Sequence, residues 1–121
     1  MKKKKTNFLK LARIAAQCAY NKKATAIMLF NTRRFSPIAD YVLLATTTSS
    51  PQSRAVIDAI KEGIDTYGGP SPLHTEGKYA ANWAVLDYGG ILIHIMSPQV
   101  RQIYALEKMW PQARKITLKM T

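Results

Sequence analysis

The strongest indication of the fold is the segment Trp83-Ala-Val-Leu-Asp-Tyr-Gly-Gly-Ile-Leu-Ile-His-Ile-Met96. Two apolar runs of strand length flank Gly89-Gly90, and Gly-Gly is a favoured pair for a two-residue hairpin turn. We therefore predict a β-hairpin with these pairs across it: Tyr88 with Ile91, Leu86 with Ile93 and Trp83 with Met96. Because successive side chains of a strand point to opposite sides, this register assigns each residue to one face of a sheet.

The two faces of the predicted hairpin differ in composition. One is apolar throughout and should face the core: Ala84, Leu86, Tyr88, Ile91, Ile93 and Ile95. The other mixes apolar side chains with an acid and an imidazole: Trp83, Val85, Asp87, Leu92, His94 and Met96. Apolar anchors among polar groups are typical of a protein-binding surface, where tryptophan is often an energetic hot spot. The alternative is that a helix covers this face and satisfies its polar groups internally.

Further from the hairpin, the segments 24–30 and 41–46 are short apolar runs without helical phase, which predicts two buried strands. Helical spacing of apolar residues predicts a helix over 7–21 with Asn7 as N-cap. A second helix should start with Ser50 as cap and Pro51 as first residue, and end at Gly68-Gly69-Pro70. Residues 70–82 are typical of a loop. Strands interleaved with helices predict an α/β fold, a single domain with a small mixed β-sheet packed with about three helices.

A third helix is predicted from Ser97-Pro98 to Trp110, before Pro111. At helical spacing its apolar arc comprises Val100, Ile103, Tyr104, Leu106 and Trp110. Glu107 falls inside this arc, where a carboxylate needs a partner or a route to solvent. We favour a buried pair over a contact at an interface edge. Arg101 lies outside the arc, where a solvated residue is expected.

The length of 121 residues fits one domain. The net charge of +11 is concentrated at the ends, because residues 1–34 hold ten basic residues and no acid. We expect a basic N-terminal tail over 1–6, the domain over 7–112, and a short basic tail over 113–121 that either adds a strand or stays loose. Lys2, Lys3, Lys4 and Lys5 are candidate RNA contacts, and a solubilising tail is the alternative.

Nothing in the sequence predicts catalysis or a cofactor. The chain lacks nucleotide-binding and hydrolase motifs, and its acids are scattered. Its two histidines, His74 and His94, have no partner at metal-ligand spacing, and Cys18 lies in an apolar helical stretch that suits a core thiol. We expect no enzyme activity, no metal and no membrane span. The lysines do not begin a secretory signal, so we expect a cytoplasmic protein, with an organellar form as the alternative.

Taken in order, the motifs resemble those of the ribosomal silencing factor family, also called Iojap-like proteins. The resemblance spans about residues 8–112 and rests on Ile38–Tyr41, Ala45–Ser49 and the pattern E-G…W-x-x-x-D-Y-G…H…R-x-x-Y-x-L-E-x-x-W from Glu76 to Trp110. Two positions depart from it: the family often has Gly at Thr47 and Asp at Gly90.

The resemblance implies a fold like that of nucleotidyltransferases without their catalytic carboxylates. It also implies binding to the large ribosomal subunit through its fourteenth ribosomal protein, which sterically blocks joining of the small subunit under nutrient limitation. Carried over to this chain, candidate contacts are Trp83, Asp87, Tyr88 and His94. The composition of the hairpin adds Leu92 and Met96, and it assigns Tyr88 to the core side instead.

Three other readings stay open at this point. The family's members are often dimers, so the mixed hairpin face could also join two copies of the chain. A basic RNA-binding or ribosome-assembly module acting through the lysine-rich ends is the alternative function. A nucleotidyltransferase-like enzyme would need clustered acids that bind Mg²⁺, which this sequence does not offer.

Overall fold

The computed structural model describes residues 6–77, 82–108 and 113–121 of the chain. Their elements in chain order are α1 (Phe8–Asn21), β1 (Thr25–Asn31), β2 (Tyr41–Thr46), α2 (Ser50–Tyr67), β3 (His74–Glu76), β4 (Trp83–Asp87), β5 (Ile91–Met96), α3 (Pro98–Tyr104), the 3₁₀ helix η1 (Leu106–Lys108) and β6 (Arg114–Ile116). The strands form one sheet in the order β3-β4-β5-β2-β1-β6.

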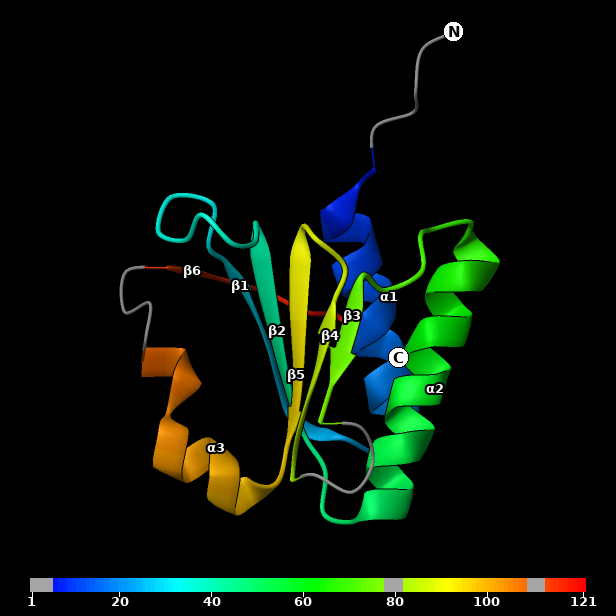
Figure 1. Ribbon diagram of the computed structural model, residues 1–121, viewed down its shortest axis with the longest axis vertical. Coiled ribbons are helices and arrows are strands. Elements are labelled where there is room, and N and C mark those ends of the chain that lie inside the picture. Colours follow the sequence, from blue (N-terminus) through cyan, green and yellow to red (C-terminus); the bar gives the residue numbers. More distant parts are fainter. Residues whose placement is uncertain (1–5, 78–81, 109–112) are drawn as a thin grey trace, which may run out of the picture.

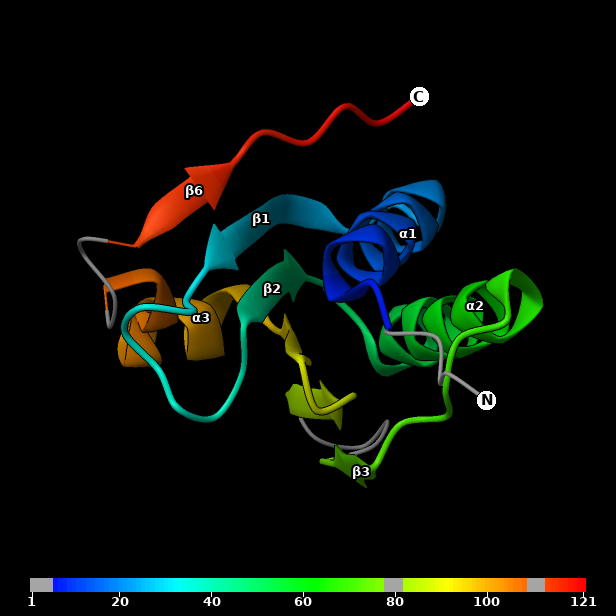
Figure 2. The same cartoon turned by 90° about the horizontal axis from the view of Figure 1, so that it is seen from above.

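The sheet lies between two unequal helical layers (Figures 1 and 2). Helices α1 and α2 cover one face, and the short α3 stands on the other. Strands β2 and β5 are parallel and all other neighbours are antiparallel. The predicted α/β fold with a mixed sheet and three helices is therefore confirmed.

The hairpin has the predicted register. Trp83 lies opposite Met96 and Leu86 opposite Ile93, while the Tyr88 amide donates to the Ile91 carbonyl at 2.9 Å. Gly89 supplies the positive φ of 86° that the turn requires. A side chain at Gly90 would start 2.2 Å from the Phe8 ring, so α1 packs directly on the hairpin tip. All six residues of the predicted core face are buried: Ala84, Leu86, Tyr88, Ile91, Ile93 and Ile95.

Helices α1 and α2 form largely as their sequences predict. The Asn7 side chain caps α1, which buries Leu11, Ala12, Ala15, Ala16 and Ala19. Helix α2 buries Val56, Ile57, Ile60 and Ile64 against the same core. Its cap is Ser49, one residue earlier than expected, so Pro51 is the second helical residue. Tyr67, the last helical residue, is 52% exposed.

The third helix is shorter than the prediction and turned differently. It ends at Tyr104 because Ala105 takes a left-handed conformation with φ 45°, and η1 follows. Ile103 and Tyr104, expected in the buried arc, are 75% and 57% exposed. Arg101, expected in solvent, is buried instead. Trp110 and Pro111 lie outside the described residues.

Two three-residue strands complete the sheet at its edges. β3 lies inside the segment 70–82, which the sequence predicts as a loop, and pairs with β4. β6 pairs with β1, which settles the open choice for the C-terminal segment. Beyond β6 the chain runs along α1, where the Arg13 side chain donates to the Thr117 carbonyl and Gln17 exchanges hydrogen bonds with Thr121. The C-terminal segment is thus packed on the domain and is not a free tail.

Strand β1 is less buried than the sequence suggested. Its pairing with β2 is irregular between Thr25 and Met28, where Ala26 has φ 49°. Only Leu29 and Phe30 are fully buried within it. In the part of the chain that the structure describes, no helix is long and apolar enough to cross a membrane.

Candidate protein-binding face

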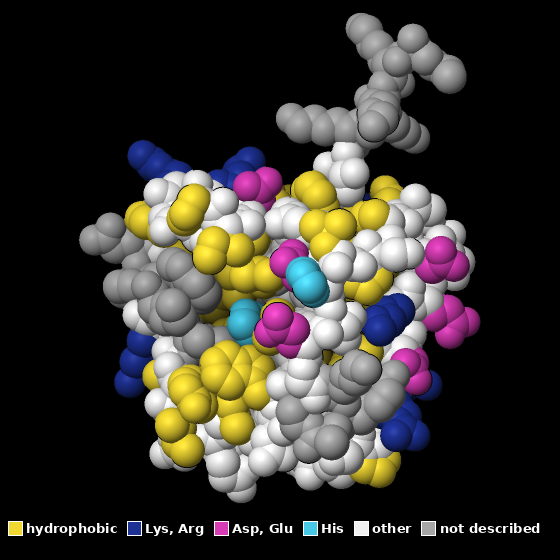
Figure 3. All heavy atoms as spheres, viewed as in Figure 1, with side chains coloured by type: hydrophobic (Ala, Val, Ile, Leu, Met, Phe, Trp, Pro, Cys, Tyr) yellow, Lys and Arg dark blue, Asp and Glu magenta, His cyan; other side chains and the backbone are white. Residues whose placement is uncertain are grey.

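The face of the hairpin that α3 leaves uncovered carries mixed side chains, as predicted. Register places Val85 opposite His94 and Asp87 opposite Leu92. Strand β3 extends this face, because His74 lies opposite Asp87 and Glu76 opposite Val85, and directly opposed residues share a face. We call this surface the hairpin face; it comprises His74, Glu76, Trp83, Val85, Asp87, Leu92 and His94. Its α3 border is Tyr104, whose ring contacts Trp83, together with Ile103, the exposed residue that precedes Tyr104 on α3. Figure 3 shows hydrophobic side chains gathered there beside both histidines and acidic groups.

Trp83 is held in place by two neighbours. Its indole Nε1 donates to His94 Nδ1 at 3.0 Å. Its ring centroid lies 4.6 Å from that of Tyr104, with the planes tilted by 50°. These contacts fix both side-chain torsions of a partly buried tryptophan before any partner binds, which reduces the entropy lost on binding.

The imidazole of His94 acts as a hydrogen-bond acceptor. Burial disfavours its charged form and lowers its pKa to about 4. At neutral pH the ring is therefore uncharged, and Nδ1 can accept the Trp83 proton. His94 therefore has a structural contact with Trp83 and also lies on the hairpin face.

Asp87 lies at the other end of the face. Its Oδ1 accepts from the Gly89 amide at 2.8 Å, which stabilises the hairpin turn. The side chain remains partly exposed beside His74 and Leu92. Asp87 therefore combines a turn contact with a negative charge at the surface.

Two predicted contact residues lie inside the protein. Met96 is 0% exposed, because α3 and the side chains of Phe30, Val42 and Leu44 enclose it in a small second core. Tyr88 is 3% exposed on the core side, where the composition argument placed it. Neither presents a side chain to a partner. Lys2, Lys3, Lys4 and Lys5 lie outside the described residues.

Four residues of the hairpin face escaped the sequence reasoning. His74 and Glu76 lie on a strand too short for an alternating pattern. Ile103 and Tyr104 were assigned to the core because a helical wheel shows an apolar arc without showing which way it faces. No sequence signal identifies these two residues, because the pattern predicts a helix as far as Trp110, and the end of the helix at the left-handed Ala105 is seen only in the structure.

The border of the face depends on Arg101. Its guanidinium is buried and donates to three acceptors from separate segments: Glu107 Oε2 at 2.9 Å, Thr46 Oγ1 at 3.0 Å and the Ala26 carbonyl. The expected buried pair of Glu107 is thereby confirmed, with Arg101 as its partner. This cluster ties α3 and η1 to the sheet and so fixes where Ile103 and Tyr104 stand.

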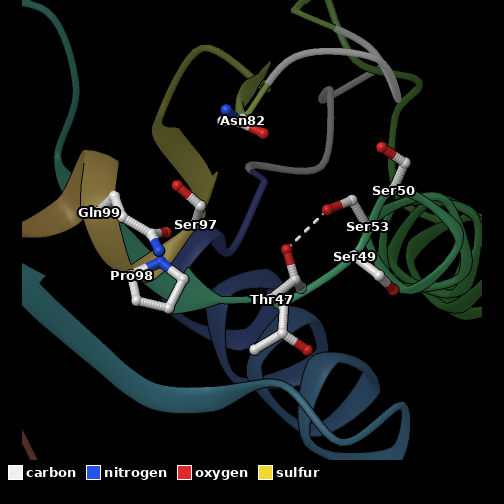
Figure 4. A pocket seen from close by; sticks show the side chains of 9 residues that line it. Thr47, Ser49, Ser50, Ser53, Asn82, Ser97, Pro98 and Gln99 are labelled. Carbon is white, nitrogen blue, oxygen red and sulfur yellow. Dashed lines mark hydrogen bonds between the residues drawn. The ribbon is translucent and has the colours of Figure 1, made fainter.

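A separate polar pocket of about 220 Å³ lies where the parallel strands β2 and β5 lead into α2 and α3 (Figure 4). Thr47 and Ser53 form a 2.6 Å hydrogen bond at its wall. The described residues that line it offer hydroxyls, amides and a proline, and none is an acid, a histidine or a cysteine. The lining therefore supplies no general base that could activate a hydroxyl.

The described acids, histidines and cysteine also form no group of three that could hold a metal ion. Cys18 lies between α1 and α2, its Sγ 2.5 Å from the position that a Cβ on Gly63 would take. Burial raises the pKa of this thiol, and nearby Glu62 raises it further. Both effects suppress the reactive thiolate, in agreement with the expected core role.

Comparison with known proteins identifies the family. A protein named ribosomal silencing factor RsfS from Haemophilus influenzae is 39% identical over 93 residues, covering 73% of this chain and 85% of that protein. One of the same name from Bacillus subtilis is 31% identical over 103 residues, covering 85% of this chain and 86% of that protein. A crystal structure from Chromobacterium violaceum superposes with a TM-score of 0.81 at 21% identity, covering 96% of this chain and 95% of the other, and supports the fold. The family described as "Ribosomal silencing factor during starvation" matches residues 5–121, and the chain belongs to this family.

Proposed function

We propose that this chain represses translation by binding the large ribosomal subunit through its fourteenth ribosomal protein, with the hairpin face as the contact surface. The bound protein would occupy the surface that the small subunit needs, so the mechanism is steric and requires no chemistry. Membership in the silencing factor family supports a role at the ribosome. The composition of the hairpin face supports a protein as the direct partner.

The charge of the hairpin face is the observation that carries this proposal. The chain has a net charge of +11, yet the described residues of this face include Glu76 and Asp87 and no lysine or arginine. Such a surface repels RNA phosphates. It complements a basic protein, which is the usual charge of proteins that bind ribosomal RNA.

The apolar anchors are placed as a protein interface requires. Trp83 lies beside Tyr104, with Ile103 close by on the same helix and largely exposed. Aromatic side chains at the centre of an interface commonly supply 2 kcal/mol or more each. Acids at the edge of such a cluster would add orientation and speed of association more than affinity.

A subunit-joining assay tests the proposal. Purified large subunits would be incubated with the full chain, small subunits added, and the products separated by sedimentation. We expect the native protein to block joining and Trp83→Ala to weaken binding by about 30-fold or more, from a loss of at least about 2 kcal/mol. Because Trp83 is partly buried, Ile103→Glu is the second variant, since a 75% exposed side chain can change without unfolding the domain.

The matched control is Tyr20→Ala, which removes an aromatic side chain that is 46% exposed on α1. It should block joining as the native protein does. Full activity of both Trp83→Ala and Ile103→Glu would refute the hairpin face as the contact. If blocking disappears only when residues 1–6 are deleted, binding of RNA by the lysine-rich start explains the activity better. If the native protein leaves joining unchanged at saturation, the proposed function is wrong.

A further inference from the structure

A second surface, at the opposite half of the sheet from the hairpin face, concentrates positive charge. A pocket of about 310 Å³ is lined by Asn31, Arg33, Arg34, Phe35 and Arg114, which we call the arginine pocket. It lies where β1, β6 and the loop after β1 meet, whereas the hairpin face lies on β3, β4 and β5. Its volume is at the lower end of the range typical of small-ligand sites.

The fold builds this pocket on a fixed base. The Thr32 amide donates to the Asp40 carbonyl at 2.8 Å, and its buried hydroxyl donates to the Ala39 carbonyl at 2.9 Å, which closes the loop at its neck. The amides of Phe35 and Ser36 both donate to the Thr32 carbonyl. Across the sheet edge, the register of β1 and β6 puts Arg114 directly opposite Asn31. Residues distant in sequence are thus held together by backbone hydrogen bonds.

Three arginines, Arg33, Arg34 and Arg114, line this pocket. Asn31 Oδ1 accepts from the backbone amide and Nε of Arg33, and the Arg33 guanidinium lies 5.7 Å above the Tyr41 ring. In the described part of the chain, which holds all seven acids, no carboxylate forms an ion pair with an arginine of this pocket. Clustered guanidinium groups repel one another, so an anion bound among them would gain both charge-assisted hydrogen bonds and relief of this repulsion.

The aromatic side chain of Phe35 indicates which class of anion would fit the arginine pocket. Phe35 is 44% exposed beside the arginines, and its ring can take the face of a flat ligand. Guanidinium groups for phosphates and an exposed aromatic ring for a base are the combination that single-stranded nucleic-acid sites use. An acidic peptide would match the arginines and leave Phe35 without a role.

We propose that the arginine pocket binds a single-stranded segment of RNA, with Arg34 and Arg114 on phosphates and Phe35 stacked on a base. Arg33, oriented by Asn31 and Tyr41, supplies a third donor group at the same site. The site goes beyond the proposed function, because it adds an RNA contact to a surface that shares no residue with the hairpin face. It also stands without that function, since a chain that fails to block subunit joining could still bind RNA here.

Fluorescence anisotropy of a short labelled uridine oligonucleotide with the full chain, over a series of salt concentrations, tests the site. The double variant Arg34→Gln/Arg114→Gln should weaken binding about tenfold or more and reduce the slope of log K against log salt by about 1.4, because each phosphate contact contributes about 0.7. Phe35→Ala should weaken binding roughly 5- to 150-fold. The control Lys10→Gln/Lys22→Gln removes the same charge at exposed positions elsewhere and should retain most of the affinity.

Each contrary result overturns a stated part of the proposal. If the control pair and the arginine pair lose the same affinity for the oligonucleotide, the RNA is attracted by the overall positive charge of the chain and the arginine pocket is not a specific site. Unchanged binding by Phe35→Ala would refute base stacking. A polyglutamate peptide that binds as tightly as the RNA, with the same losses, would reassign the pocket to an acidic protein. Because the subunit-joining assay with Trp83→Ala reports on the other surface, failure of one proposal is distinguishable from failure of the other.

Discussion

Replacement of Arg101 by methionine should strongly destabilise the domain. The guanidinium is buried and bonded to Glu107 Oε2, Thr46 Oγ1 and the Ala26 carbonyl. Methionine fills most of the same volume, so the loss is electrostatic: one carboxylate and two further acceptors lose their donor. Removal of one partner from a buried ion pair costs about 3–5 kcal/mol.

This loss converts into a large change in melting temperature. Unfolding entropy is about 2.1 cal/mol/K per residue, or about 0.25 kcal/mol/K for 121 residues, so Tm should fall by about 12–20 °C. Glu107→Ala should cost less, about 1–2 kcal/mol, because the Glu107 side chain is 28% exposed and Arg101 keeps two acceptors. Arg101→Lys is the matched control and should fall between the two, since an ammonium keeps the charge without the guanidinium's geometry.

Thermal unfolding followed by circular dichroism measures all three variants under one condition. A shift below 2 °C for Arg101→Met, well under the ~12 °C expected, would refute the reasoning that the buried guanidinium holds α3 to the sheet. An unchanged Tm for Glu107→Ala combined with loss of ribosome binding would move Glu107 from a structural role into the interface. A fall in Tm in the order expected would tie the exposed positions of Ile103 and Tyr104 to this buried cluster.

Two further predictions concern single buried groups. The Tyr88 hydroxyl is buried and has no hydrogen-bond partner among the described residues, and burial raises its pKa to about 12. Tyr88→Phe should therefore stabilise the fold by about 1 kcal/mol in urea titration, and a loss of about 1 kcal/mol or more would show that the hydroxyl has a partner. The pKa of His94 is lowered from 6.5 to about 4. As pH falls, this histidine therefore binds a proton in the unfolded chain before it does so in the folded protein. The stability that neutral His94 contributes is full above pH 6.5 and is lost as pH falls towards 4. In His94→Gln the amide oxygen can still accept from Trp83 but does not titrate. Between pH 7 and pH 4.5 the free energy of unfolding should therefore fall by about 1–2 kcal/mol less in this variant than in the native protein, and equal falls would contradict a buried neutral imidazole.

Much of the candidate site could be predicted from the hairpin sequence alone. Alternation along the two strands placed Trp83, Asp87, Leu92 and His94 on one face, and the structure finds them there. The same alternation put Tyr88 inside. It could not show that α3 would cover Met96, because burial on that face depends on an element outside the hairpin.

Local sequence patterns are sufficient to predict the hairpin with its register, both long helices and the mixed α/β class. These features follow from local periodicity and from turn or cap residues, such as Gly89 and Asn7, that act on their own neighbours. Interactions of this kind are encoded within a few residues, so they can be recognised without knowledge of the rest of the chain.

The edges of the sheet and the orientation of α3 depend instead on contacts between segments that are distant in the sequence. β3 and β6 are three residues long, and such strands form only because a longer strand already offers its free edge. The direction of α3 is set by Arg101, whose acceptors include Ala26 and Thr46, 75 and 55 residues away in the chain. A buried guanidinium needs hydrogen-bond acceptors around it. The acceptors of Arg101 come from segments that are far apart in the sequence, so they form a group only after the chain has folded.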